Sequence, residues 1–286
     1  MVKMIIFIVA YIVLAPFVGG FLAGLDRIIS ARMQGRVGPP VLQPFYDVLK
    51  LFEKEKITVN KVQDFYVACF LLFVVVTGCF FFAGGDLLLV LFTLTTASAF
   101  LIIAAYSSNS PYAQLGAERE LLQTMAYEPM VLLTAVAFYV FTGSFKVSDI
   151  MNSESMGILP MLGIFIGFMY ILTIKFRKAP FDLSMSHHAH QELVAGLKTE
   201  FSGTTLALLE VAHWYENIFL LGFIFLFFQN GSIAGVIIGI VVAIIAFFET
   251  FIGNSFARMK WQVAFKSAWI VAAVLGIINL FLLYFI

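Results

Sequence analysis

Apolar runs of membrane-spanning length dominate this chain and restrict it to one class of fold. The hydrocarbon core of a bilayer is about 30 Å thick, and a helix needs roughly 20 apolar residues to cross it. Hydrophobic residues make up 62% of the sequence and charged residues only 12%. Six clear runs cover residues 4–25, 65–83, 87–106, 157–174, 233–252 and 263–286. The sequence therefore predicts an all-α, polytopic transmembrane bundle, with residues 1–286 forming a single integral membrane domain.

A seventh apolar run, Ile218–Phe228, is too short to cross a membrane. The helix that contains it must begin earlier and carry Glu210, His213 and Glu216 into the bilayer. Glu210 and His213 share one helical face with Asn217, and Glu216 lies a further step round. Ionisable groups that face lipid are costly. We therefore expect this face to turn into the bundle or to line water.

The eighth run, Met130–Thr142, has the same defect. Its helix must extend back through Gln123, which buries Glu128. Further back, Glu118 and Glu120 are expected at the cytoplasmic mouth of the helix, where surface salt bridges are their predicted role. The fold thus has about eight spans, with short amphipathic surface helices in its cytoplasmic loops.

Basic residues are distributed very unevenly among the loops between these eight spans. The loops after the first, third, fifth and seventh spans hold 15 of the 17 Lys and Arg residues, and the other two are Lys3 and Lys146. Cytoplasmic loops of membrane proteins carry the excess of Lys and Arg. We therefore predict a multi-pass protein of the cytoplasmic membrane with both termini outside. The long loops, about 26–64 and 175–204, face the cytoplasm and are candidate docking loops.

The first of these loops combines a proline-rich turn with a short amphipathic segment. After Pro44, apolar residues recur at helical spacing and predict a helix lying at the membrane surface. One interpretation is an interfacial anchor with snorkelling lysines. The other is a docking surface, because arginines beside glycines can pair with carboxylates of a bound protein. The predicted docking residues are Arg27, Arg32, Arg36, Gly38, Pro39 and Pro40.

The second long loop contains three of the four histidines, His187, His188 and His190, flanked by Asp182 and Glu192. Three interpretations are open: a metal site, a solvated surface cluster, and a pH-sensitive group that feeds protons into a polar path. A metal site lacks cysteine partners or a second ligand cluster. Because imidazole titrates near neutrality, we predict that Asp182 and the three histidines form a cytoplasmic entry and coupling loop.

The acidic residues continue from this loop into the predicted helices. Glu200 follows Glu192 toward the bilayer, and Lys198 is a possible counter-charge. The groups could be polar contacts between helices, each partnered and inert. Carboxylates and imidazoles with shifted proton affinities can also pass a proton between neighbours. The predicted proton path consists of Glu128, Glu192, Glu200, Glu210, His213 and Glu216.

Two long motifs in this order resemble a known family. QGRVGPP, followed by LQPFYDVLKLFEKE, is similar to the first cytoplasmic loop of the complex I subunit 1 family, which includes membrane subunits of energy-converting [NiFe] hydrogenases. KAPFDL, ELVAG and TEFSG resemble its second hallmark. The resemblance covers essentially the whole chain. It implies that Glu128, Glu192 and Glu200 belong to a polar channel linking the electron-transfer arm to antiporter-like subunits.

Within that family, SHHAHQELVAG and ALLEVAHWYE resemble the corresponding membrane subunit of Ech-type hydrogenases. Quinone-linked members tend to carry a glutamate around His213 and lack the loop histidines. The resemblance implies a membrane anchor and proton-path subunit of a ferredoxin-linked, ion-pumping complex. The implied partners are the hydrogenase large and small subunits, a ferredoxin-like iron–sulfur subunit and an antiporter-like membrane subunit. The alternative is the quinone-site subunit of a complex I-type oxidoreductase.

We expect no cofactor in this chain, and we expect it to be part of an enzyme without being the catalyst. Its two cysteines, Cys69 and Cys79, are too few to ligate an iron–sulfur cluster. The [NiFe] centre and [4Fe-4S] clusters are therefore expected in the partners. A net charge of zero gives no bulk attraction to nucleic acid. A stand-alone secondary transporter would show an inverted repeat, and none is evident. A purely structural anchor is a further alternative.

Overall fold

The structure is a computed structural model that describes residues 2–55, 57, 60–153, 156–178, 180–181, 184–185, 193–229, 233–247 and 249–285. These residues are almost entirely helical and contain no strand beyond one isolated bridge between Asp86 and Lys146. The α-helices are α1 (Val2–Met33), α2 (Gln43–Glu53), α3 (Lys61–Phe82), α4 (Leu87–Tyr106), α5 (Pro111–Thr142), α6 (Val147–Met151), α7 (Leu162–Lys175), α8 (Gly203–Leu226), α9 (Ile233–Phe247), α10 (Glu249–Ser255), α11 (Trp261–Val271) and α12 (Ile278–Phe285). A 3₁₀ turn, η1 (Gly196–Lys198), precedes α8, and a π-helical stretch, η2 (Ala272–Ile277), joins α11 to α12.

The predicted class of fold is confirmed. Six helical segments of the described chain are long and apolar enough to cross a membrane: Met4–Met33, Lys61–Phe82, Leu87–Tyr106, Pro111–Thr142, Gly203–Leu226 and Trp261–Phe285. Shorter apolar helices, Leu162–Lys175 and Gly235–Ile244, lie at the other two predicted positions. Several bounds differ from the predicted ranges; α7, for example, begins at Leu162 and not at residue 157. Helix α1 runs on to Met33 and α5 begins at Pro111, because neither Lys/Arg nor Glu breaks a helix even where it ends an apolar run.

Local sequence explains where several of these helices begin and end. The side chain of Asn60 accepts a hydrogen bond from the Val62 amide and caps α3, while Asp86 accepts from the Leu88 amide and caps α4. Pro111 occupies the first turn of α5, where its missing N–H costs nothing. Gly143 ends the same helix with φ of 74°, a left-handed conformation that glycine adopts without strain.

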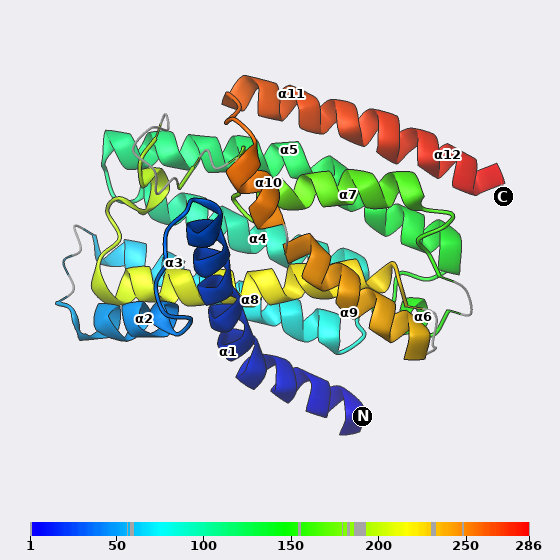
Figure 1. Ribbon diagram of the computed structural model, residues 1–286, viewed down its shortest axis with the longest axis horizontal. Coiled ribbons are helices and arrows are strands. Elements are labelled where there is room, and N and C mark those ends of the chain that lie inside the picture. Colours follow the sequence, from blue (N-terminus) through cyan, green and yellow to red (C-terminus); the bar gives the residue numbers. More distant parts are fainter. Residues whose placement is uncertain are drawn as a thin grey trace.

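Helix α8 runs through the middle of the bundle (Figure 1). It packs against α1, α2, α3 and α9, while α5 packs against α4, α7 and α11. The interior of the half containing α5, α7 and the end of α8 is filled by phenylalanine rings in mutual contact, among them Phe81, Phe138, Phe168, Phe219, Phe223 and Phe227. Many apolar side chains of α1 and α12 are exposed, as expected for surfaces in contact with lipid.

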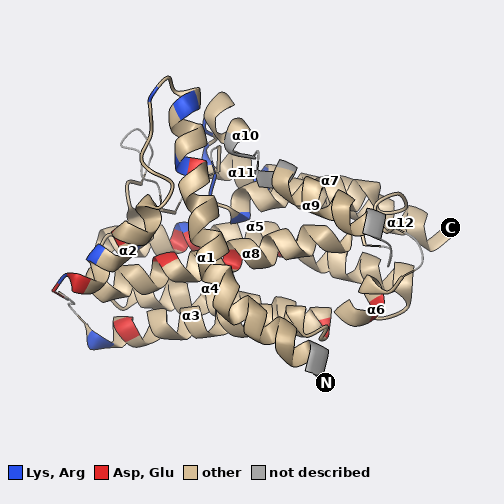
Figure 2. Ribbon diagram, turned by 60° about the horizontal axis from the view of Figure 1, so that its bottom comes forward, with Lys and Arg blue, Asp and Glu red and all other residues tan. Residues whose placement is uncertain are grey.

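The predicted amphipathic surface helix is present as α2. Val48 is buried, and Phe45 packs its ring against Trp214 of α8 with a centroid distance of 5.2 Å. Leu49 and Phe52 remain exposed. Charged residues gather toward the end of the bundle that carries α2, and both termini lie toward the other end (Figure 2).

Candidate functional site

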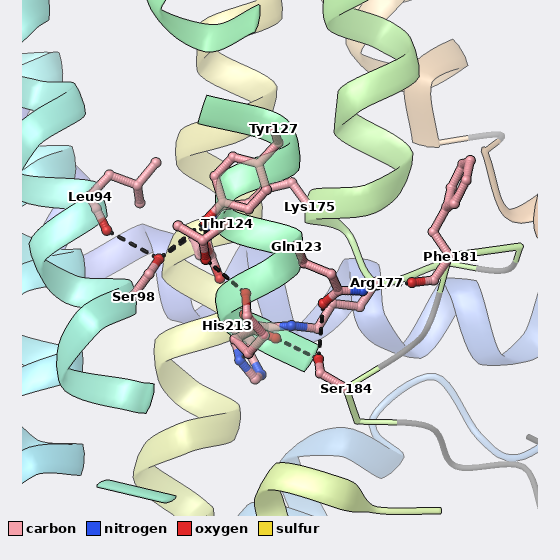
Figure 3. Close-up of polar contacts among 12 residues, drawn as sticks. Leu94, Ser98, Gln123, Thr124, Tyr127, Lys175, Arg177, Phe181, Ser184 and His213 are labelled. Atoms are coloured by element: carbon pink, nitrogen blue, oxygen red, sulfur yellow. Dashed lines mark hydrogen bonds and ion pairs between the residues drawn. The ribbon is translucent and has the colours of Figure 1, made fainter. Parts of the chain in front are cut away.

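Charged side chains from three helices meet inside the bundle where α7 ends (Figure 3). Lys175 is the last residue of α7, and Arg177 follows two positions later. Helix α5 contributes an acidic residue, and α8 contributes two ionisable residues at i and i+3 on one face. We call this set the buried charge network, and it consists of Glu120, Lys175, Arg177, His213 and Glu216.

Lys175 and Glu216 form the first ion pair of the network. Lys175 Nζ lies 2.8 Å from Glu216 Oε1, and only 6% and 4% of the two side chains are exposed. Lys175 Nζ also donates to Tyr127 Oη at 2.9 Å and to Ser98 Oγ at 3.4 Å. These contacts use the three donors of the ammonium group. Because each charge has a partner and further hydrogen bonds, the pair is tolerated away from water.

Arg177 and Glu120 form the second ion pair. Arg177 Nη2 lies 2.7 Å from Glu120 Oε1, whose side chain is 4% exposed. Ser184 donates to the other oxygen of the same carboxylate. The second terminal nitrogen of Arg177, Nη1, contacts His213 Nε2. Arg177 has φ of 53°, in the left-handed region. A residue with a Cβ adopts that conformation at a cost of about 1–2 kcal/mol.

The turn after α7 is held to α5 by hydrogen bonds beside this second pair. Gln123 Nε2 donates to the Phe181 carbonyl at 2.8 Å, and Gln123 Oε1 lies 3.1 Å from Ser184 Oγ. The Ser184 carbonyl accepts from the Leu197 amide at 3.1 Å. The start of the second long loop and η1 are thus tied to the helix that carries Glu120.

A small cavity of about 20 Å³ lies beyond Lys175, between α4, α5, α7 and α8. Lys175 and Tyr127 border it at one side, and the rest of its lining is apolar and includes Phe168, Phe219 and Phe223. A cavity of this size could hold one water molecule, but an apolar cavity stays dry. The network is therefore bounded on this side by hydrocarbon.

Comparison with known proteins places the chain in a family. The family described as NADH dehydrogenase matches residues 3–284. The chain belongs to this family. One subunit of the NADH-quinone oxidoreductase of Rhodospirillum rubrum is 28% identical over 293 aligned positions, which cover 90% of this chain and 86% of the relative. Hydrogenase-4 component C of Escherichia coli is 26% identical over 220 residues, which cover 72% of this chain and 69% of the relative.

One solved structure is similar over nearly its whole length. A chain in the structure of the membrane-bound sulfane sulfur reductase, an archaeal respiratory membrane complex, superimposes with a TM-score of 0.83 and 27% identity. The similarity covers 96% of this chain and 99% of that chain. The resemblance to the complex I subunit 1 family is thus confirmed, including its link to hydrogenase membrane subunits.

In this member of the NADH dehydrogenase family, the acidic residues predicted from span length lie inside helices. Glu216 is buried in α8 and Glu128 is half-buried in α5. Glu210 pairs with Lys198, with 3.5 Å between Oε1 and Nζ, so Lys198 is the counter-charge suggested by the sequence. Glu200 is half-buried just before α8. The structure thus places these groups along α5 and α8, and their role as a proton path stays a prediction.

The prediction for Glu120 was wrong. Glu120 was expected in a surface salt bridge, but 3% of the residue is exposed and its carboxylate is paired inside the bundle. The reason is the length of α5. The helix begins at Pro111, so Glu120 lies more than two turns into it, on the face that packs against the turn after α7.

Sequence reasoning also missed Lys175 and Arg177. Both were counted as basic residues of a cytoplasmic loop, because they follow an apolar run. A usable signal was present: the sequence forces carboxylates of other helices into the bilayer, and buried carboxylates require cations. The first basic residues after an apolar run are the nearest candidates for that pairing.

The predicted entry and coupling loop lies outside the described residues, as does one member of the predicted proton path. These residues are Asp182, His187, His188, His190 and Glu192. Whether the loop histidines hold a metal or feed protons into the network stays a prediction.

The predicted docking residues have different surroundings. Arg27 is paired with Asp47 of α2 at 2.5 Å, whereas Arg32 and Arg36 are exposed. Burial alone would raise the pKa of the Asp47 carboxyl, but hydrogen bonds from Arg27 and Gln43 hold it below its usual value. Gly38 adopts φ of 82° and lies with Pro39 and Pro40 in a non-helical segment, in which Pro39 is half-buried and Gly38 and Pro40 are exposed.

Proposed function

We propose that the chain is the membrane-anchoring, proton-path subunit of a ferredoxin-linked, ion-pumping [NiFe] hydrogenase complex. At the coarser level it is a membrane subunit of a complex I-like oxidoreductase, as its relatives are. The hydrogenase assignment is supported by the similarity to hydrogenase-4 component C and by the SHHAH and HWYE segments. The [NiFe] centre and [4Fe-4S] clusters would belong to the large, small and ferredoxin-like subunits. An antiporter-like subunit would lie next to the chain in the membrane.

The observation that carries this proposal is the buried charge network. Two cations and two carboxylates, beside an imidazole, occupy the interior of a predominantly apolar bundle. Such groups in a membrane interior are costly and mark ion and proton pathways. The network also begins at the turn that leads into the second long loop. Soluble partners bound to the two long loops could therefore change the charge state inside the membrane.

The test separates electron transfer from ion pumping in the reconstituted complex. Glu128→Gln, Glu200→Gln and Glu216→Gln are each compared with the unmodified complex in sealed vesicles. Hydrogen production from reduced ferredoxin and the uptake of H⁺ and of Na⁺ by the vesicles are measured together. We expect hydrogen production to continue, while uptake of the pumped ion falls to the rate at which that ion leaks across the vesicle membrane. Glu118→Gln is the matched control, because Glu118 lies on α5 but is exposed. Fully coupled pumping in all three variants would overturn the proposal in favour of a structural anchor.

A quinone-site subunit is the second candidate, favoured by the similarity to the NADH-quinone oxidoreductase of Rhodospirillum rubrum. It predicts that the purified complex reduces a soluble quinone and that quinone-site inhibitors block its turnover. The hydrogenase proposal predicts hydrogen production that such inhibitors leave unchanged.

A further inference from the structure

The contact between Arg177 and His213 restricts which ring nitrogen of His213 can carry a proton. Arg177 Nη2 is occupied by Glu120, and Nη1 points to Nε2 of the imidazole. His213 lies on α8 one turn before Glu216, and the edge of its ring meets Phe70 of α3 at a centroid distance of 5.9 Å. The imidazole is therefore packed between an aromatic ring and a guanidinium group.

The chemistry of the two groups fixes the tautomer. A guanidinium group has five N–H donors and no acceptor, and it stays charged in proteins. In the contact with Arg177, Nε2 of His213 must therefore be the acceptor. An imidazole that accepts at Nε2 carries its proton on Nδ1 and is neutral. A protonated His213 would place one N–H against another and one positive charge against another.

Among the described residues, the charged groups on the elements around His213 have partners of their own. Glu120 from α5 has Arg177, Glu216 from α8 has Lys175, and Glu210 from α8 has Lys198 of the η1 turn. From α1, Asp26 has Lys178, which follows Arg177. On α3, Asp64 accepts from the hydroxyl of Thr205. Each of these five described carboxylates thus has a cation or donor of its own.

From this geometry we infer that Arg177 and a proton compete for Nε2 of His213. The position of the Arg177 side chain therefore controls whether His213 can be protonated. While Arg177 contacts the ring, His213 is a neutral acceptor. It takes a proton only after the guanidinium group moves away. The inference deepens the proposed function, on which it rests, by naming the group that opens or closes the path. Arg177 acts through His213 and is a positioning residue.

The test measures the protonation of His213 directly. The complete complex, labelled with nitrogen-15 histidine, is placed in lipid nanodiscs, and the ring nitrogens are followed by NMR between about pH 5 and pH 8, where imidazole titrates. The His213→Gln variant identifies the signal. We expect a neutral ring with its proton on Nδ1 in the unmodified complex. In Arg177→Gln the midpoint of protonation should rise by about one pH unit or more, because a neighbouring positive charge has been removed.

Removal of Arg177 alone leaves Glu120 buried without its cation, which can prevent folding. The double variant Glu120→Gln/Arg177→Gln removes both charges and should still show an upward shift, because Nε2 no longer has a competing donor. The shift should be smaller than in Arg177→Gln, because the Glu120 carboxylate that favours a protonated imidazole is also gone. Lys146→Gln, which removes an exposed cation between α5 and α6, is the matched control and should leave the titration unchanged. A proton on Nε2 in the unmodified complex at about pH 7, or an unshifted midpoint in both Arg177 variants, would overturn the inference.

The same variants keep this inference separate from the proposed function. A shifted titration together with fully coupled ion pumping would overturn the proposed function and support the competition at His213. An unshifted titration with lost pumping would overturn the competition and leave the proposed function standing.

Discussion

At the scale of single residues, the Lys175 ammonium is a buried charge whose stability depends on several partners at once. It contacts a carboxylate, a phenol and a hydroxyl, and it lies 4.6 Å from the centre of the Tyr127 ring. The Tyr127 hydroxyl in turn donates a hydrogen bond to Thr124 Oγ1 at 3.3 Å. The Glu216 carboxylate, the Tyr127 phenol and the Ser98 hydroxyl each lose a partner if Lys175 is removed.

We expect Lys175→Met to be more damaging than the removal of both members of its ion pair. The single change leaves Glu216 buried and unpaired, which costs about 3–5 kcal/mol of unfolding free energy. In Lys175→Met/Glu216→Gln neither charge of the pair remains, so most of the lost unfolding free energy should be recovered. Unfolding of this chain within the purified complex, followed by a thermal or denaturant series, measures both. Equal losses in the two variants would contradict the account of the pair.

At the scale of elements, α1, α3 and α8 meet at a point where there is no room for an additional methyl group. A Cβ at Gly78 of α3 would lie 2.1 Å from the ring of Tyr11 on α1. Tyr11 Oη donates to the Tyr215 carbonyl at 3.2 Å, and Tyr215 Oη donates to the Ile12 carbonyl at 2.7 Å. These reciprocal hydrogen bonds fix α1 against α8, so the ring of Tyr11 cannot easily move.

Gly78→Ala is therefore expected to loosen the attachment of α1. Overpacking a close contact of this kind costs about 1–3 kcal/mol, measurable as lower unfolding free energy or faster proteolysis at α1. Gly222→Ala is the matched control, because its Cβ would meet the tip of the Phe82 ring at 3.1 Å, which needs a far smaller shift. A control that is as damaging as Gly78→Ala would contradict the steric explanation.

The elements also show what the sequence could and could not predict. Span length alone placed Glu128 and Glu216 inside helices, because an apolar run that is too short must borrow polar neighbours. The partners of these carboxylates depend on which helices lie side by side, and periodicity within one helix contains no such information. For that reason the sequence alone predicts loop positions for Lys175 and Arg177 and a surface position for Glu120.

At the scale of the whole molecule, basic residues and termini lie toward opposite ends of the bundle (Figure 2). The unequal distribution of Lys and Arg predicts that both termini lie outside. A C-terminal fusion to alkaline phosphatase should therefore be active, and a fusion to green fluorescent protein should be dark. The opposite pair of results would reverse the orientation.

The exposed arginines of the first loop give a prediction about assembly. Arg32→Glu/Arg36→Glu should release the soluble subunits, so that hydrogenase activity no longer sediments with the membranes. Arg27→Glu should release less, since Arg27 is already paired with Asp47 and is less available to a partner. Lys146→Glu, at the other end of α5, serves as the control. Complete retention in the double variant would show that docking does not use these arginines.

Helix α7 has only 14 residues, Leu162–Lys175. At 1.5 Å per residue it spans about 21 Å, several ångströms less than the hydrocarbon thickness. The helix ends at Lys175, whose ion pair with Glu216 is almost completely buried, so non-helical backbone begins directly beside buried charges. Inside a membrane such backbone is tolerated only where protein or water covers it. A partner bound to the second long loop would be separated from the buried ion pairs by a few residues of chain. Under the proposed function, the end of α7 at Lys175 would give a bound partner a short route to a charge inside the bundle.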